Sequence, residues 1–165
     1  MELYIDGVPN PINDDPSAKD WTVTKRVNVP AGSRVIAIKA TDKGLSAGLL
    51  ASMADESLLS DGTWKVSTVE SDGWTKPEFD DSNWKQATEL GQHGMEPWKT
   101  RNLISSKAKW IWTATSYYKD MGSHVVYFRY RIGTSLVPHI KRFSRRTLFN
   151  HDEFCCILLL FVCVM

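Results

Sequence analysis

The segment most informative about the fold of this 165-residue chain is residues 73–84, which read Gly73-Trp74-Thr75-Lys76-Pro77-Glu78-Phe79-Asp80-Asp81-Ser82-Asn83-Trp84. Four consecutive residues that favour side-chain-stabilised turns, 80–83, stand between the aromatic residues Phe79 and Trp84. Long ordered loops are usually functional or held in place by their own side chains. We therefore predict a tight turn stabilised by carboxylates, with an aromatic side chain buried on either side. The structural motif consists of Phe79, Asp80, Asp81 and Trp84.

Short runs of alternating apolar and polar residues surround this segment. Residues 124–132 place Val126 and Phe128 on one face, and residues 63–68 place Trp64 and Val66 on one face. The other expected strands are 3–5, 21–29, 34–40, 48–53 and 107–114, of which 48–53 would equally suit a helix. Glycine and proline separate these runs, as in the turns of β-proteins. The pattern predicts an all-β sandwich.

The overall composition excludes several classes of protein. The chain is 42% hydrophobic and 24% charged, which is ordinary for a globular domain and argues against disorder throughout, collagen or coiled coil. Its formal net charge of +1 gives no general attraction to nucleic acid or to an anionic membrane. We therefore expect no nucleic-acid partner.

The last 32 residues differ in kind from the rest. All three cysteines, Cys155, Cys156 and Cys163, lie there, so a disulfide-stapled or cysteine-zinc body is excluded. A basic cluster at 141–146 precedes twelve consecutive apolar residues, 154–165, which is short of the roughly 20 that a spanning helix needs. This run is either a tail anchor that ends early or sequence translated past a splice site, and its length favours the second. We predict a domain over 1–133 and a tail, 134–165, outside the fold, with membrane association only if the apolar run is genuine.

Four motifs of this chain resemble those of galactose-binding-like jelly-roll domains and follow one another in the same order as in that family. Such domains are non-catalytic modules of β-galactosidases, α-rhamnosidases and invertebrate extracellular proteins. The resemblance covers residues 2–133 and implies an antiparallel jelly-roll β-sandwich whose first strand, expected before Leu3, is absent. It also implies an extracellular location, although the chain opens with no signal peptide. The motifs are Leu3-Tyr-Ile-Asp-Gly-Val8, Arg34–Ala40 with Ala47–Leu50, Gly73–Trp84, and Ala108–Trp112 with Val126–Arg129.

Carbohydrate recognition requires an exposed aromatic face and nearby groups that bond hydroxyls. Strand alternation predicts burial of most tryptophans, whereas Trp74 and Trp98 lie in loop sequence, with His93 and Arg101 nearby in the chain. These four residues are the candidate ligand-binding residues. The alternative is that both indoles cap the edges of the sandwich.

No catalytic residues are predicted. Asp80 and Asp81 are adjacent, so they do not flank a glycosidic bond as hydrolysis requires, and residues 1–154 offer no cysteine nucleophile. The resemblance raises the prospect of a structural calcium ion, for which 13–15 and 80–81 supply oxygen ligands without a fixed-spacing loop. No other cofactor is expected.

The sequence thus predicts a non-catalytic, lectin-like carbohydrate-binding module that forms part of a larger extracellular protein. Its partner would be a carbohydrate or glycoprotein. Two alternatives stay open: a structural or adhesive module that binds protein, and an accessory domain of a glycosidase.

Overall fold

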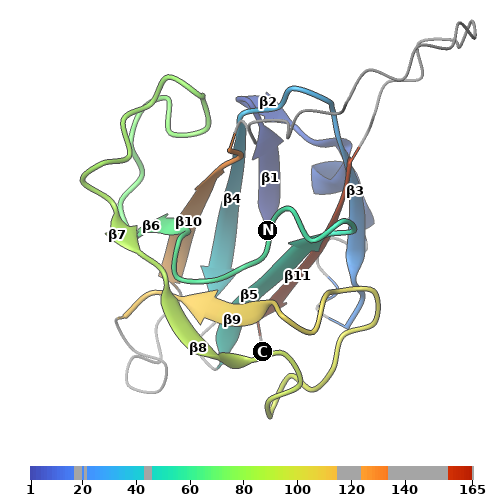
Figure 1. Ribbon diagram of the computed structural model, residues 1–165. Coiled ribbons are helices and arrows are strands. Elements are labelled where there is room, and N and C mark those ends of the chain that lie inside the picture. Colours follow the sequence, from blue (N-terminus) through green and yellow to red (C-terminus); the bar gives the residue numbers. More distant parts are fainter. Residues whose placement is uncertain (17–19, 21, 43–45, 115–123, 134–155, 165) are drawn as a thin grey trace, which may run out of the picture.

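The computed structural model describes residues 1–16, 20, 22–42, 46–114, 124–133 and 156–164. These residues form two antiparallel β-sheets and one short 3-10 helix (Figure 1). The prediction of an all-β sandwich is confirmed. Within the described ranges, no helix is long and apolar enough to cross a membrane.

The first sheet has the strand order β2-β1-β4-β10-β6-β7. Its longest pairing joins β4 and β10, in which Phe128 lies opposite Ile38 and Tyr127 opposite Lys39. Odd- and even-numbered side chains of β10 therefore face opposite sides of the sheet, as the alternation predicts. The strands are β1 (Glu2–Ile5), β2 (Val8–Pro9), β4 (Val35–Asp42), β6 (Lys65–Ser67), β7 (Lys85–Gln86) and β10 (His124–Arg131).

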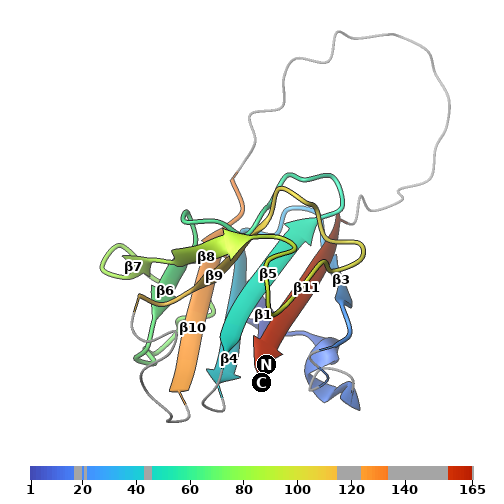
Figure 2. The ribbon, with the colours of Figure 1, turned by 90° about the horizontal axis from the view of Figure 1, so that it is seen from below.

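The second sheet has the order β3-β11-β5-β9-β8 and lies beside the first (Figure 2). Its strands are β3 (Lys25–Val29), β5 (Ala47–Met53), β8 (Thr88–Gln92), β9 (Lys109–Trp112) and β11 (Cys156–Val164). The 3-10 helix η1 (Pro11–Asp14) lies between β2 and β3 in the chain. Asn10 caps η1, because its side-chain oxygen accepts a hydrogen bond from the Ile12 amide.

The structure differs from the sequence prediction at residues 156–164, which were expected outside the fold. They form β11, which pairs with β3 on one side and β5 on the other. A short, continuous apolar run is typical of a strand inside a sheet. The run is too short for a membrane-spanning helix, but it is long enough for such a strand. The rest of the predicted tail, 134–155 and 165, lies outside the described residues. That a domain ends at residue 133 stays a prediction, which the deletion in the Discussion tests.

A second difference concerns residues 85–92, where no strand was expected. The segment contains β7 and β8, and β8 pairs with β9 across a register shift between Glu89 and Gly91. The alternation of polar and apolar residues at 88–92 is weak, and a glycine in such a segment suggests a turn. In the structure a β-bulge accommodates this glycine within the strand.

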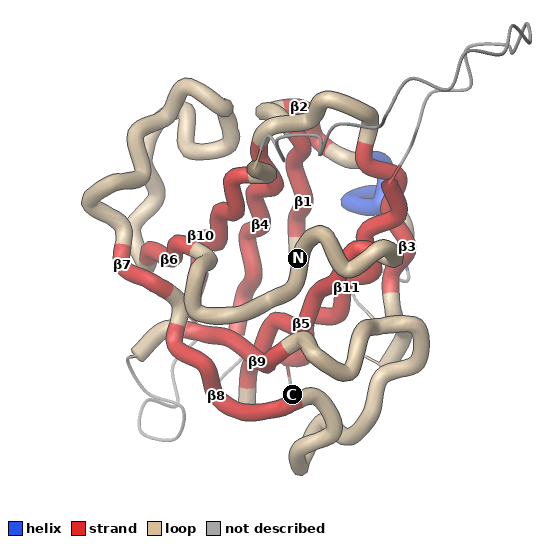
Figure 3. The backbone as a smooth tube through the Cα atoms, in the orientation of Figure 1, coloured by secondary structure: helices blue, strands red, loops and turns tan. Residues whose placement is uncertain are grey.

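The main core lies between the sheets, and each outer sheet face carries a further apolar cluster. Long loops cover these outer faces (Figure 3). Trp74 and Trp84 of the 73–84 loop pack on Val35, Ala37 and Tyr127, on the outer face of the first sheet. On the second sheet, Leu50 and Trp110 are covered by Trp98 and Ile104 from the loop that joins β8 to β9. The aromatic-rich loops thus extend the core beyond the two facing sheets.

Gly48 leaves the space that this second cluster occupies. A Cβ atom at Gly48 would lie 2.9 Å from Cε3 of Trp110 and 3.3 Å from Cζ2 of Trp98. Both indoles are fully buried and their rings lie 4.6 Å apart, so neither has room to withdraw. We expect Gly48→Ala to destabilise the protein by about 1–3 kcal/mol through overpacking. Urea denaturation measures this loss of stability. Ser106→Ala is the control, because Ser106 is exposed. Gly32→Ala is unsuitable as a control because Gly32 has a positive φ.

Candidate functional site

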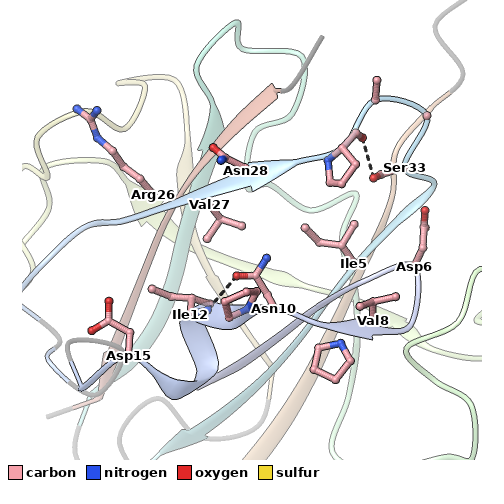
Figure 4. Close-up of a pocket in the computed structure, with 15 residues that line it drawn as sticks. Ile5, Asp6, Val8, Asn10, Ile12, Asp15, Arg26, Val27, Asn28 and Ser33 are labelled. Atoms are coloured by element: carbon pink, nitrogen blue, oxygen red, sulfur yellow. Dashed lines mark hydrogen bonds between the residues drawn. The ribbon is translucent and has the colours of Figure 1, made fainter. Parts of the chain in front are cut away.

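A pocket of about 780 Å³ lies beside β3. Its walls come from the β1–β2 turn, η1, β3 and the turn at 30–33 (Figure 4). This volume lies within the range of roughly 300–1,000 Å³ that small-molecule sites occupy. The pocket is therefore the candidate functional site.

The interior of the pocket is largely aliphatic. Figure 4 shows Val27 pointing from β3 toward Ile12 and Asn10, with Ile5 farther along the same gap. Val27 and Ile5 are buried, and Val8 at the edge is 65% exposed. Three prolines, Pro9, Pro11 and Pro30, complete the apolar lining. Such a surface suits the C–H face or a methyl group of a ligand.

Polar groups stand around this interior. Asp15 is exposed at the end of η1, and Asn10 holds its side-chain oxygen on the Ile12 amide at 3.1 Å while its amide nitrogen remains a donor. Ser33 donates to the Pro30 carbonyl at 2.8 Å. Arg26 and Asn28 point to the other side of β3 and reach only the edge of the pocket (Figure 4). The polar lining thus combines an acceptor, Asp15, with a donor, Asn10.

Asp6 has a structural role in the same pocket. Its carboxylate accepts hydrogen bonds from the backbone amides of Arg34, at 2.9 Å, and Val35, at 2.8 Å. The residue has a positive φ and opens the β1–β2 turn together with Gly7. Asp6 therefore fixes the turn at 6–7 to the start of β4 and shapes the pocket wall.

The four ligand-binding residues predicted from sequence lie elsewhere. Trp74 is 5% exposed and Trp98 is fully buried, because each anchors a covering loop on the outer face of a different sheet. The structure brings Trp98, His93 and Arg101 together in one loop but does not bring Trp74 to them. Neither indole presents an open face for stacking on a sugar, so the packing alternative accounts for their positions; ligand contact through these residues stays a prediction.

His93 and Arg101 hold the β8–β9 loop in shape. The amide of Arg101 donates to Nε2 of His93 at 2.7 Å, and Nδ1 of His93 lies 3.1 Å from the Ser105 carbonyl. A neutral imidazole protonated at Nδ1 satisfies both contacts. The ring therefore joins two parts of the loop.

The 73–84 motif forms a turn in which the two aspartates accept hydrogen bonds. Asp80 accepts a hydrogen bond from the Ser82 amide at 2.9 Å, which holds the pKa of this carboxyl below its usual range. Trp84 is buried and contacts Phe79 edge-on, with the rings 5.6 Å apart, although Phe79 is only half-buried. The turn thus forms between two aromatic side chains.

Sequence reasoning missed the partner of this motif, which is a pair of arginines on β10. Nε of Arg129 lies 2.9 Å from Asp81 Oδ2, and Nε of Arg131 lies 3.2 Å from Asp81 Oδ1. Arg129 is fully buried and also donates to the carbonyls of Trp74 and Lys76. The available signal was two arginines at alternate positions of one strand in a chain with an aspartate-rich loop.

Two further features of the described residues bear on chemistry. No group of three histidine, cysteine, aspartate or glutamate side chains is placed there to hold a metal ion, and a structural calcium ion stays a prediction. A smaller cavity of about 270 Å³ lies beside Asn83, Trp84 and Thr113, separate from the β3 pocket.

Comparison with known proteins gives one partial relative. No family model matches the chain, and no solved structure matches it. An α-L-rhamnosidase of Streptomyces avermitilis is 32% identical in an 89-residue alignment that covers 49% of this chain. The match spans 9% of that enzyme. The similarity and the two-sheet structure are compatible with a β-sandwich module associated with glycosidases.

Proposed function

We propose that this protein is a non-catalytic carbohydrate-binding module whose sugar site is the β3 pocket. The observation that carries the proposal is the pocket itself, an aliphatic interior of about 780 Å³ with Asp15 and Asn10 at its side. A carboxylate accepts hydrogen bonds from sugar hydroxyls, an amide donates to them, and aliphatic side chains contact the C–H face of the ring. The partial similarity to a glycosidase supports a carbohydrate ligand.

The aliphatic interior favours a 6-deoxy sugar over a fully hydroxylated hexose. A methyl group in place of a hydroxymethyl group would contact Val27 and Ile12 without leaving a buried hydroxyl unpaired. L-Rhamnose is a 6-deoxyhexose, and the similar enzyme carries this sugar in its name. Rhamnosides are therefore the first ligands to test. The module would act outside the cell, on a polysaccharide or glycoprotein.

Binding of L-rhamnose, L-fucose, D-galactose and D-glucose can be compared by protein-observed NMR. We expect the two deoxy sugars to bind and Asp15→Ala to weaken binding at least about tenfold, the effect of losing roughly one strong hydrogen bond. Asp14→Ala is the matched control, since Asp14 is an exposed neighbour in η1 that does not line the pocket. Equal loss in both variants, or no binding by a folded sample, would contradict the proposed site.

A glycosidase accessory domain is the second candidate, and the partial match to an enzyme favours it. It shares the sugar site but requires a catalytic domain in the same polypeptide. A structural module that binds protein would remain if the sugar panel is negative.

A further inference from the structure

The strand β11 occupies a slot that the rest of the second sheet leaves open. It runs antiparallel to β3, with Cys156 opposite Val29, and antiparallel to β5, with Phe161 opposite Leu50. Because both neighbours are antiparallel to β11, β3 and β5 run parallel to each other. Among the described strands, β3 pairs with β11 alone. Removal of β11 would expose two facing edges of unpaired backbone groups, one on β3 and one on β5.

The sequence of β11 suits pairing between chains as well as within one. Residues 156–164 read Cys-Ile-Leu-Leu-Leu-Phe-Val-Cys-Val and contain no charge, proline or glycine. Segments of this composition add readily to open strand edges, and charged or proline residues are what normally prevent it. Nothing within β11 itself selects the same chain over another.

The connection to β11 is long. Residues 132–155 separate the end of β10 from the start of β11. At about 3.3–3.6 Å per extended residue, a connection of this length reaches up to roughly 80 Å, well beyond the width of a domain of this size. The same strand can therefore reach the slot of a neighbouring molecule.

The balance between the two arrangements depends on concentration. Strand contacts are the same whether β11 comes from the same chain or from a second copy. Two separate monomers each bear the entropic cost of closing a long loop, whereas an exchanged dimer avoids both closures and requires one association between chains. Because association depends on concentration, the exchanged form becomes more populated as protein concentration rises.

We infer that the slot between β3 and β5 is a strand-acceptor site for β11 of a second copy, which makes the protein a reciprocal strand-exchanged dimer. The inference concerns assembly rather than the sugar site. β3 contributes to both, but β11 pairs with β3 in the same register whether it comes from the same chain or from a second copy, so the pocket forms in either arrangement. Failure of one leaves the other intact.

Disulfide trapping distinguishes the donor chain. Val29 is buried and faces Cys156 across the β3–β11 ladder, so Val29→Cys places two thiols on directly opposite residues. The variant is made with Cys155→Ser and Cys163→Ser to leave one native thiol. Chains of two lengths, one carrying a tag, are unfolded, mixed, refolded together and oxidised.

The expected product is a disulfide-linked dimer that contains one long and one short chain, increasing between about 10 µM and 1 mM protein. Adding Cys156→Ser should abolish it. Crosslinks only within single chains would overturn the inference, and so would no crosslink at position 156. Light scattering of the unmodified chain is the second measurement: a monomer at every concentration would overturn the inference without dependence on any substitution.

Discussion

Asp81→Ala is expected to destabilise the protein by about 3–5 kcal/mol, the usual cost of removing one partner of a buried ion pair. The substitution leaves the guanidinium of Arg129, which is fully buried, without its counter-charge. The carbonyls of Trp74 and Lys76 still accept hydrogen bonds from Arg129, but they carry no net charge to offset burial. Chemical denaturation followed by tryptophan fluorescence measures the loss, because Trp74 and Trp84 belong to the same loop cluster.

Asp80→Ala provides the matched control. Asp80 is the adjacent carboxylate, is exposed, and accepts a hydrogen bond from Ser82 within its own turn. Its replacement should change stability much less than replacement of Asp81. Similar effects from the two substitutions, or a loss below about 1 kcal/mol for Asp81→Ala, would show that the arginine pairing does not hold the loop.

The same pairing predicts a dependence on pH. Burial alone raises the pKa of Asp81, but hydrogen bonds from Arg129 and Arg131 and their charges outweigh it, so the pKa lies below its usual range. A carboxyl with a lowered folded-state pKa stabilises the protein fully above its unfolded pKa, near 3.9, and this contribution is lost as pH falls below that value. The stability difference between the wild type and Asp81→Ala should therefore be constant from about pH 5 upward and shrink on acidification.

Deletion of residues 134–165 should abolish the cooperative unfolding transition or lower its free energy by more than about 5 kcal/mol. The truncation removes β11, which pairs with β3 over five residues and with β5 over seven. At about 0.5–1.5 kcal/mol for each hydrogen bond, such a ladder is comparable with the whole stability of a small domain, about 5–15 kcal/mol. Circular dichroism and thermal unfolding of the truncated and full chains measure the difference.

Leu160→Pro in the full chain separates the loss of the strand from the loss of residues 134–155. Proline in a central strand removes a ladder hydrogen bond, so this variant should also be strongly destabilised. An unchanged melting temperature in the truncated chain would instead establish a domain that ends at residue 133, as the sequence predicts.

The local part of the fold was predictable from residue patterns. Alternation in 124–132 and 63–68 placed Phe128 and Trp64 on the buried face, and the structure confirms both. The strands β7 and β8 were not predicted, because both are short and largely polar and β8 contains a glycine. The partners of the 73–84 loop lie about 50 positions later in the chain, and no local pattern indicates which arginine meets which carboxylate.

The candidate site was less predictable than the fold. An aromatic residue in loop sequence is equally consistent with a binding face and with a packing anchor, and burial distinguishes the two: Trp98 is fully buried. The apolar lining of the β3 pocket is largely valine, isoleucine and proline, which carry no functional signature of their own. These residues line a cavity only because the fold brings the β1–β2 turn, η1 and β3 together.

The hydrogen bonds of Arg129 also constrain the order in which the protein can fold during synthesis. The 73–84 loop leaves the ribosome about 50 residues before the arginine that pairs with Asp81. During that interval the loop lacks its counter-charge, and the surface of β4 that Trp74 and Trp84 cover is not yet flanked by β10. In the nascent chain the two indoles therefore lack Tyr127 of β10, and with it part of their burial, until that strand has emerged, and we expect the loop to reach its final packing only then.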